Sequence, residues 1–500
     1  MSKAAEVENE HSAEIYLLLA RAQQSLEDYA GALESICKVE KYINEESDKD
    51  FLRRYYSLRG EISLVNGNIS NSVDNYNQSI NYALNQEEKV KLFNKALNAL
   101  THLSISTENL AANNFEYQKL FANVQPYTQF NGFESIIQGE RRIRIGYLSP
   151  YFKKSEYFSF IYGILACQNR ERFEVTCYSL NSADDPFTKA IEPAVEHFKR
   201  VKDMTTKQLA AKISEDQIDI LVDLAGHNAE TALPVFAYRP APVQISGIGA
   251  TATSGLDTIS YFITDKQTDP PGQHDRFFKE TFIYMPCQFC YASNSEAPQP
   301  VPAPAIEKGY VTFGAFHNYN KIGDDMLAVW REILNRVPNS RLIIRADEFN
   351  SDSLVDSAYN RMKNLGFNMD TVSFRSVTMD YLSDYLEIDI MLDTFPRSDA
   401  MTTFDALFMG VPVVSFYDER RDSRYALTIL QNVGLGDFAV NNGNAYMDRA
   451  IGLANDKEAL NILHRDLRSM IQKNNNLQPR HYTNILEQCY EHIIKQFQAN

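Results

Sequence analysis

Two kinds of hydrophobic pattern divide the chain. From about residue 10 to residue 129, apolar residues recur at helical spacing, which predicts a series of amphipathic helices. From residue 141 onward, short apolar runs bounded by turn residues alternate with helical stretches, and this alternation predicts parallel sheets covered by helices. The chain is therefore predicted to be an α/β protein with an N-terminal α-helical domain.

The predicted strands form two series separated by a linker. We expect strands at residues 143–147, 173–178, 218–223, 244–247 and 261–265, and again at residues 310–316, 341–345, 372–374, 388–392 and 413–417. Pro298, Pro300, Pro302 and Pro304 lie between the two series and resist regular structure. Two doubly wound, Rossmann-like lobes of this kind present the carboxyl ends of their strands to a shared cleft, where open α/β sheets bind ligands.

These patterns also predict the extent of each part. We expect the helical domain at residues 1–129, the two lobes at residues 141–297 and 307–475, and a C-terminal helix at residues 476–500 that packs on the lobes.

The helical region contains a weak internal repeat. Ala20 and Gly60 stand at matching positions where paired helices would approach closely, and a third, degenerate unit is expected at residues 87–120. The spacing resembles that of tetratricopeptide helix pairs. Such repeats either form a groove for a peptide or partner, or cap the neighbouring domain, and the sequence leaves both open.

Residues 392–407 combine the end of a buried strand, a tight loop and the start of a helix. Free backbone N–H groups and the positive end of the helix dipole would point into the loop, where Thr402 and Thr403 could donate to a diphosphate. Asp405, one turn further on, could accept a hydrogen bond from a ribose hydroxyl. The alternative is an ordinary strand-to-helix turn with a Ser or Asp N-cap.

Composition narrows the class of protein. The formal net charge is -16 and the pI is about 5.1, with Lys and Arg scattered along the chain, which argues against nucleic acid as the main partner. No window contains the ~18 consecutive apolar residues of a membrane span, and the first residues lack the apolar core of a signal peptide. We therefore expect a cytoplasmic protein with reduced cysteines.

Four blocks of sequence occur in a recognisable order. Residues 223–228 read D-L-A-G-H-N, residues 236–244 read F-A-Y-R-P-A-P-V-Q, residues 313–321 read F-G-A-F-H-N-Y-N-K, and the loop at 392–407 follows them. In this order they resemble the O-GlcNAc transferases and their bacterial SPINDLY-type relatives, which join tetratricopeptide repeats to a two-lobed GT-B glycosyltransferase. The resemblance covers about residues 141–496, with the repeats beside it.

The resemblance implies a GT-B fold and a chemistry. A sugar, with GlcNAc favoured, would pass from a UDP-sugar to Ser or Thr of a protein acceptor with inversion, and without a metal or other cofactor. An Asn-modifying hexosyltransferase of the same broader family stays open. A metal-free site fits the sequence, because its only D-x-D carboxylate pair, Asp48 and Asp50, lies in the helical region.

The resemblance also implies donor-binding residues. Lys321 matches the family's diphosphate-contacting lysine, whose positive charge would stabilise the leaving group as a catalytic residue. Asn318 could bind the base or a phosphate, and Tyr381 falls where many relatives have a histidine against the uracil base. Thr402, Thr403 and Asp405 complete the expected donor site, with Asp405 at the position of the ribose-binding carboxylate.

Two further residues are candidates for work on the acceptor. His227 directly follows a buried strand and could orient the acceptor or take its proton. Asp184 lies in an acidic loop that matches one facing the family's cleft, and it could assist the acceptor. The alternatives are a histidine satisfied by neighbouring backbone and a carboxylate that only adds solubility.

The sequence departs from the family pattern at several positions. Ser155 and Ser159 stand where relatives have histidines, and Asp399 and Met401 replace a glycine and a threonine of the family's motif in residues 392–407. A carboxylate at a helix N-terminus competes with a phosphate for the same positive field, at a cost of about 1 kcal/mol or more if desolvated. It could instead point away as an N-cap. A non-catalytic, partner-binding member, or a homo-oligomer formed through the helical domain, therefore stays open beside the enzyme.

Overall fold

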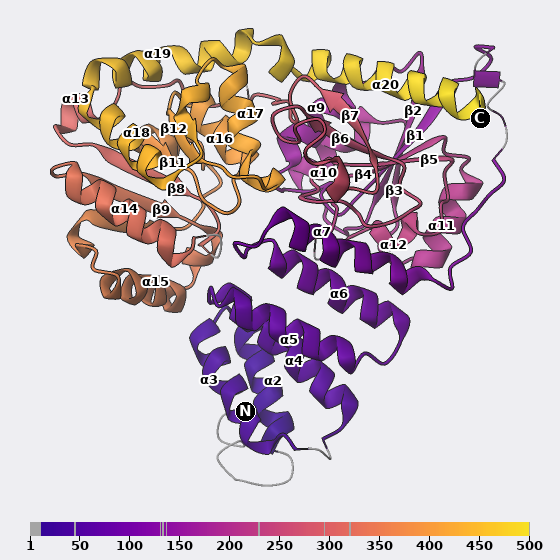
Figure 1. Cartoon of the computed structure of the whole chain (residues 1–500), viewed down its shortest axis with the longest axis horizontal. Helices are drawn as coiled ribbons and strands as arrows, with labels where there is room; N and C mark the ends of the chain where they lie inside the picture. The colour runs from indigo at the N-terminus through magenta and orange to yellow at the C-terminus, as the bar shows by residue number, and fades with distance from the viewer. Residues whose placement is uncertain are drawn as a thin grey trace.

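Two α/β lobes lie side by side above a helical domain (Figure 1). The computed structural model describes residues 12–44, 47–130, 132, 135–136, 138–228, 231–294, 296–319 and 322–499. The N-terminal helices form the lower part of the molecule, and two long C-terminal helices run across the top of both lobes (Figure 1). The predicted α/β class with an N-terminal helical domain is confirmed.

The helical domain consists of consecutive helices that pack against one another. They are α2 (Ser12–Ser25), α3 (Tyr29–Val39), α4 (Lys49–Val65), α5 (Ile69–Asn81), α6 (Gln86–Leu100) and α7 (Thr107–Phe115), followed by the 3₁₀ segment η2 (Glu116–Phe121). Helices α3 to α7 each begin after a residue whose side chain accepts a hydrogen bond from a first-turn N–H: Asp28, Asp48, Asn68, Asn85 and Ser106.

Gly60 marks the close approach of α4 and α5. A Cβ atom at this position would lie 2.8 Å from the ring of Tyr76 on the next helix, so a larger residue would force the pair apart. Ala20 is likewise fully buried within the first helix pair. The small residues that indicated a repeat thus lie at helix contacts, while the assignment to tetratricopeptide repeats stays a prediction.

The N-terminal lobe is built on a 7-stranded parallel sheet with the order β3-β2-β1-β4-β5-β6-β7. Its strands are β1 (Ile143–Ser149), β2 (Phe173–Ser179), β3 (His197–Arg200), β4 (Ile220–Asp223), β5 (Val243–Ser246), β6 (Tyr261–Asp265) and β7 (Thr281–Met285). Its helices are α9 (Phe158–Cys167), α10 (Pro186–Ile191), α11 (Thr206–Glu215) and α12 (Leu233–Phe236). The five predicted strands are confirmed, and β3 and β7 extend the sheet at its edges.

The C-terminal lobe repeats the design with a 6-stranded parallel sheet in the order β10-β9-β8-β11-β12-β13. Its strands are β8 (Thr312–Phe316), β9 (Arg341–Arg345), β10 (Val372–Arg375), β11 (Ile390–Leu392), β12 (Val413–Phe416) and β13 (Ala439–Val440). Its helices are α13 (Ala305–Lys308), α14 (Asp324–Arg336), α15 (Asp352–Asn364), α16 (Ala400–Phe408), α17 (Tyr425–Asn432), α18 (Gly443–Asn455) and α19 (Lys457–Lys473).

Hydrophobic packing joins the three parts of the molecule. One core cluster contains residues of both lobes, among them Ile145 of β1 and Phe404 of α16. A second cluster joins α6 and η2 to the N-terminal lobe, with Leu97 and Tyr117 packed among residues of β1, β4 and α12. The last helix, α20 (Pro479–Ala499), leaves the C-terminal lobe and packs on α9 of the other lobe (Figure 1).

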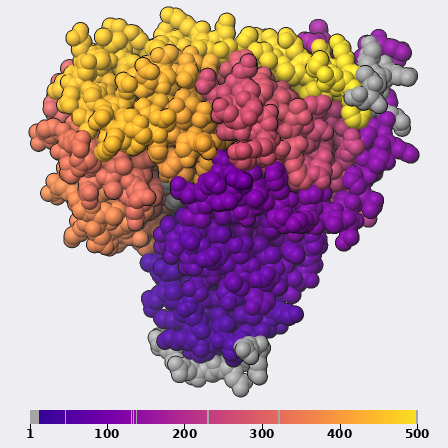
Figure 2. Space-filling view, in the orientation of Figure 1, coloured from indigo at the N-terminus to yellow at the C-terminus, as the bar shows by residue number. Residues whose placement is uncertain are grey.

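The space-filling view shows the same arrangement as a surface. The helical domain projects below the two lobes and closes off the underside of the region where they meet (Figure 2). Across the described residues, no helix is both long enough and apolar enough to span a membrane.

Candidate functional site

The candidate site lies where the strands of the two sheets end. In each sheet the strand order reverses beside the first strand, between β1 and β4 in one lobe and between β8 and β11 in the other. Loops that follow such a switch point are the usual ligand-binding loops of open parallel sheets. In the C-terminal lobe this is the loop of residues 393–399, which connects β11 to α16 and is called the donor loop.

A buried carboxylate ties the donor loop together. Asp393 accepts hydrogen bonds from the hydroxyls of Ser398 at 2.7 Å and Ser415 at 2.6 Å, and from the backbone N–H of Thr394 at 2.9 Å. Burial raises the pKa of Asp393 to about 6, although these donors favour its charged form. Ser398 also accepts from the backbone N–H of Ala426, so the loop is fixed to α17 as well.

The N-terminus of α16 is capped by the chain itself. Asp399 is the N-cap residue, and its side chain accepts from the backbone N–H of Thr402 at 3.1 Å. The hydroxyl of Thr403 donates to the backbone carbonyl of Asp399 at 2.7 Å. The N-cap orientation, one of the two expected for Asp399, is therefore the one adopted. A donor phosphate at this helix end would have to compete with a carboxylate already in place.

Asp405 lies one turn further along α16 in a cage of aromatic residues. Its carboxylate accepts a hydrogen bond from the Tyr291 hydroxyl at 2.6 Å, and it also interacts with the hydroxyl of Tyr381. Tyr291 belongs to the segment between the lobes, and its ring stacks on Phe404 with centroids 5.1 Å apart. Desolvation raises the pKa of Asp405 to about 7. The structure thus brings together Asp405 and Tyr381, two of the predicted donor-binding residues.

Arg345 is the cation of this cage, and the sequence analysis missed it. Its guanidinium lies 4.0 Å from the ring centroid of Phe316 and donates to the backbone carbonyl of Tyr381 and to Asp384. It also contributes to holding down the pKa of Asp405. The available signal was its position at the carboxyl end of a predicted strand, where site residues of such sheets gather. Tyr291 lies outside the predicted strands and helices and gave no comparable signal.

His227 lies on the side of the N-terminal lobe that faces the helical domain. Its Nε2 donates to the carbonyl of Ser254 at 2.8 Å, and its Nδ1 is 2.9 Å from the side-chain amide of Asn94 on α6. The edge of the Tyr117 ring packs against it with centroids 4.7 Å apart. Burial lowers the pKa of His227 to about 4, so the ring is neutral at pH 7. Both nitrogens are engaged, and its role toward an acceptor stays a prediction.

The other predicted residues are spread around the site. Asp184 has an exposed side chain and pairs with Lys189 at 3.3 Å and with Arg200 at 3.7 Å. Asn318 is exposed just beyond the end of β8. Lys321, the predicted diphosphate contact, lies outside the described residues.

The space between the donor loop and the N-terminal lobe is nearly filled. A cavity there measures only about 20 Å³, and its walls include Tyr157, Ser398, Asp399, Met401 and Tyr425. Pockets for nucleotide-sized ligands usually measure ~300–1,000 Å³. A donor can therefore enter this space only if the lobes or the loops facing the cleft move apart. Ser155, at one of the positions that departs from the family pattern, donates to the carbonyl of Tyr151 within the same loop.

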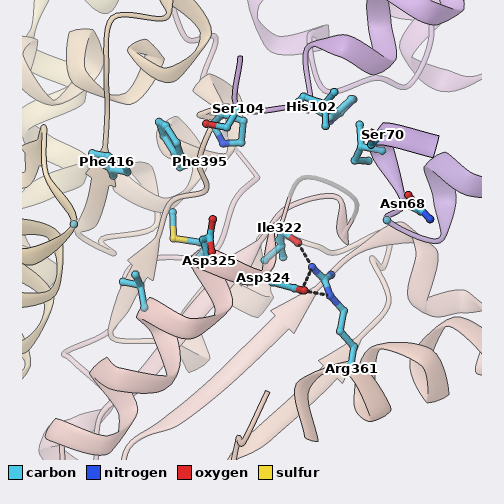
Figure 3. Close-up of a pocket in the computed structure, with 18 of the residues that line it drawn as sticks. Asn68, Ser70, His102, Ser104, Ile322, Asp324, Asp325, Arg361, Phe395 and Phe416 are labelled. Atoms are coloured by element: carbon cyan, nitrogen blue, oxygen red, sulfur yellow. Dashed lines mark hydrogen bonds and ion pairs between the residues drawn. The ribbon is translucent and has the colours of Figure 1, made fainter. Parts of the chain in front are cut away.

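A much larger cavity lies on the other side of the donor loop. It measures about 600 Å³ and separates the helical domain from the C-terminal lobe. Figure 3 shows Phe395 of the donor loop and Phe416 on one side, His102 and Ser70 of the helical domain on another, and the pair formed by Asp324 and Arg361 below. The cavity is thus lined by side chains of both the helical domain and the C-terminal lobe.

Two consecutive arginines hold the parts of the molecule together around this loop. Arg420 binds both oxygens of Asp422, at 2.9 and 2.6 Å, and donates to the carbonyls of Thr101 and Leu103 just beyond the end of α6. Arg421 binds Asp269 of the N-terminal lobe at 2.8 Å. Both arginine side chains are almost fully buried.

Arg397, in the donor loop itself, makes a parallel link to the helical domain. It donates to the hydroxyl of Thr101 at 3.0 Å and lies 3.7 Å from Asp422. The helical domain, the donor loop and the loop after β12 therefore meet in one buried polar cluster.

The carboxylates that gave the only D-x-D pattern have structural partners. Asp48 caps α4, and Asp50 pairs with Arg53 at 2.6 Å and Arg54 at 3.0 Å. Within the described ranges, no group of three or more His, Cys, Asp or Glu side chains is arranged to hold a metal ion.

Comparisons with known proteins cover the same elements. The sequence model of glycosyl transferase family 41 matches residues 109–296 and 304–486, which include both sheets and the donor loop. A relative from Petunia hybrida, named "Probable UDP-N-acetylglucosamine–peptide N-acetylglucosaminyltransferase SPINDLY", is 34% identical over 380 residues, covering 74% of this chain and 41% of that protein. An Arabidopsis thaliana protein of the same name is 32% identical over 415 residues, covering 81% of this chain and 45% of the relative.

The chain spans less than half the length of these curated relatives. Among solved structures, a point mutant of Thermobaculum terrenum O-GlcNAc transferase superimposes with a TM-score of 0.81 and 22% sequence identity. The match covers 98% of this chain and 99% of that structure, so the whole architecture, helical domain included, has a known counterpart.

Proposed function

Since the chain belongs to glycosyl transferase family 41, with the O-GlcNAc transferases and SPINDLY proteins, we propose that it transfers a sugar from a UDP-sugar to a protein acceptor. Its helical domain and two parallel-sheet lobes form an α/β GT-B fold. GlcNAc is the favoured sugar and Ser or Thr the favoured acceptor residue, with inversion at the sugar and no metal or other cofactor.

The observation that carries the proposal is the family match on both sides of the cleft. It includes the strand ends of each lobe and runs through the donor loop and α16. The names of the relatives from Petunia and Arabidopsis describe transfer of a sugar from a UDP-sugar to a peptide, which is the same class of reaction. A cleft lined by both lobes is also the place where a two-lobed fold brings a nucleotide donor and an acceptor together.

The proposed reaction exchanges one bond at the sugar, moves one proton and builds negative charge on the diphosphate. The acceptor hydroxyl oxygen forms a bond to the anomeric carbon, while the bond from that carbon to the diphosphate oxygen breaks and UDP leaves with the electron pair. The hydroxyl proton passes to a base or to the departing phosphate. Because negative charge grows on the diphosphate, fixed positive groups beside it lower the barrier. We assign this task to the N-terminus of α16 and, by resemblance, to Lys321.

The donor-binding roles follow from the cage around Asp405. Its carboxylate accepts hydrogen bonds from tyrosine hydroxyls here, and ribose hydroxyls are donors of the same kind. Tyr381 presents a ring beside it for the base. Binding then exchanges tyrosine hydroxyls for ribose hydroxyls, and Asp399 must share or give up the N-terminus of α16.

Two measurements test the proposal. Thermal unfolding of the full chain should shift upward with UDP or UDP-GlcNAc, because a ligand that binds only the folded state stabilises it. Intact-mass analysis of acceptor proteins co-expressed with the chain should show the mass increment of one sugar. Lys321→Ala should remove both signals, while Lys363→Ala, an exposed lysine on α15, should leave them unchanged.

The outcomes separate the alternatives. Stabilisation by UDP without transfer would indicate a binding module, and the absence of both signals would refute the enzyme. The mass increment would also distinguish GlcNAc from the hexose of an Asn-modifying enzyme. A cytoplasmic location and an oligomer formed through the helical domain belong to the same proposal, supported by the sequence composition and the repeat-like helices.

A further inference from the structure

We propose that the groove between α6 and the N-terminal lobe binds an acidic, partly apolar polypeptide segment. This inference rests on the function proposed above, under which the segment belongs to the acceptor protein. The groove is separate from the cavity beside the donor loop, and its volume is about 640 Å³. It falls in the range of ~300–1,000 Å³ typical of ligand sites, which is enough for a few residues of chain.

The floor of the groove is apolar. Val90, Phe121, Leu180 and Pro234 line it, and Met204, at 40% exposure, stands at its edge. These residues come from α6, η2 and three segments of the N-terminal lobe, and Figure 1 shows α6 beside α12 of that lobe. An apolar floor between two domains holds side chains of a bound segment by burial, independent of charge.

The walls of the groove carry positive charge from both sides. Lys91 and Lys95 project from α6, while Lys202 and Lys207 belong to the N-terminal lobe. Among the described lining residues, Glu87 is the only acidic side chain. This concentration of lysines contrasts with a chain whose formal net charge is -16. An acidic partner is therefore drawn to this groove and repelled by most of the remaining surface.

The two lobe lysines are the ones available to a ligand. On α6, Lys91 pairs with Glu87 at 2.8 Å and Lys95 pairs with Glu61. Lys202 instead contacts only the neutral hydroxyl of Ser182 within the described ranges, at 3.3 Å. Lys207 has no ion pair within the part of the chain that the structure describes. Carboxylates of a bound segment would form ion pairs with these two lysines without displacing an existing ion pair.

The chemistry of the groove suits a polypeptide better than a phosphate ligand. At the N-terminus of α11, a capping box engages the backbone N–H groups of Thr205 and Gln208, which leaves fewer donors there for an anion. No arginine lines the groove among the described residues, and the bidentate forks that favour phosphate are therefore missing. Flexible lysines above an apolar floor match alternating acidic and apolar side chains.

The groove also borders the carboxyl ends of strands in the N-terminal lobe. Asn94 lines it and contacts His227, which follows β4 at the edge of the sheet where the lobes meet. Leu180, at the end of β2, lies at the same edge. The groove therefore lies beside strand ends of the N-terminal lobe.

Fluorescence anisotropy with labelled synthetic peptides tests the inference on the full chain. One peptide alternates Glu with Leu and Ser, and its partner has Lys in place of every Glu. We expect the acidic peptide to bind at least about tenfold more tightly than the basic one, with an affinity that falls as salt rises. Lys202→Glu combined with Lys207→Glu should weaken the acidic peptide by at least about tenfold.

A matched pair of lysines controls for overall charge. Lys457→Glu combined with Lys473→Glu on α19 changes the net charge equally on exposed sites far from the groove, and it should leave the affinity unchanged (Figure 1). Equal binding of both peptides, or equal losses in both double variants, would overturn the inference. Equally tight binding of a single-stranded oligonucleotide would also overturn it, because the groove would then be a general polyanion site.

The stabilisation by UDP is measured on the same variants. It should persist in the groove variant, since the donor loop is untouched. If UDP stabilises the unaltered chain but that chain does not prefer the acidic peptide, only the groove is rejected. A missing UDP signal in the unaltered chain instead rejects the proposed function.

Discussion

At the scale of single residues, the site contains buried carboxylates whose charged forms lower the stability of the folded protein. Burial raises the pKa of Asp405 to about 7 and that of Asp393 to about 6. Asp223, the last residue of β4, accepts from the hydroxyl of Ser246 at 2.7 Å and also has a pKa raised to about 6. Each charged carboxylate therefore destabilises the folded protein near neutral pH, a cost that proteins commonly retain at functional sites.

Asp405→Asn tests whether the carboxylate that lowers stability is needed to bind UDP. The folded pKa of Asp405 lies above its ordinary value, so the protonated group contributes fully at low pH and the folded state loses stability as the pH rises from about 4 to about 7. The variant should therefore gain stability relative to the parent between pH 5 and 8, by an amount on the order of a few kcal/mol. Urea unfolding of the parent and the variant at pH 5 and at pH 8 measures this difference in the free energy of unfolding.

The same variant should lose affinity for UDP, because an amide replaces the acceptor of the ribose hydroxyls. Asp448→Asn, at an exposed position of α18, should change neither property. A stabilised Asp405→Asn that still binds UDP like the parent would make Asp405 a structural residue only.

Asp399→Ser addresses the competition at the N-terminus of α16. Serine keeps the cap on the Thr402 N–H but removes the negative charge that a diphosphate would meet. The affinity for UDP, measured by calorimetry, should rise by about fivefold, equivalent to ~1 kcal/mol. Asp437→Ser, at the start of a distant 3₁₀ turn, is the control. An unchanged affinity would place the diphosphate elsewhere.

At the scale of elements, the Arg420–Asp422 pair connects the loop after β12 to the end of α6. Arg420→Met leaves Asp422 buried without its bidentate partner and removes the donors to the carbonyls of Thr101 and Leu103. We expect a loss of about 3–5 kcal/mol in the free energy of unfolding, together with faster hydrogen exchange at the end of α6. Arg465→Met, at an exposed pair, should leave the free energy of unfolding almost unchanged. Equal losses would contradict the role of this cluster.

Among the strands that the sequence predicted, the central ones have the strongest hydrophobic signal. The central strands β1, β4 and β8 are buried along their length, whereas the missed strand β3 is half exposed and reads His-Phe-Lys-Arg. Edge strands bury one side only, so their composition resembles that of loops. Strand β13 has only two residues and is too short for any periodicity.

The site also has parts that could be predicted from local sequence and parts that could not. The donor loop and the cap of α16 could be predicted because they are local in sequence: Asp399, Thr402 and Thr403 interact within one turn. The contacts of Asp405 with Tyr291 and of His227 with Asn94 join residues far apart in the chain. Such pairings arise when the lobes and the helical domain pack together, and no local pattern encodes them.

At the scale of the whole molecule, the lobes are too close together for a donor. The space beside the donor loop measures about 20 Å³, and Lys154 of one lobe reaches Met379 of the other, with Nζ and Sδ 3.7 Å apart. Buried links such as Arg421 to Asp269 join the two lobes. We therefore expect donor binding to include a hinge motion that separates Lys154 from Met379.

A cross-link across the rim tests this motion. In a Cys37→Ser background, which removes the exposed native cysteine, Lys154→Cys and Met379→Cys are joined by a short bismaleimide. The cross-linked protein should show no stabilisation by UDP, because the rim cannot open, whereas the same protein before cross-linking should be stabilised. Each single-cysteine variant treated with the reagent controls for modification alone. If the cross-linked protein still responds fully to UDP, the donor enters by movement of the loops within one lobe, and the lobes need not separate.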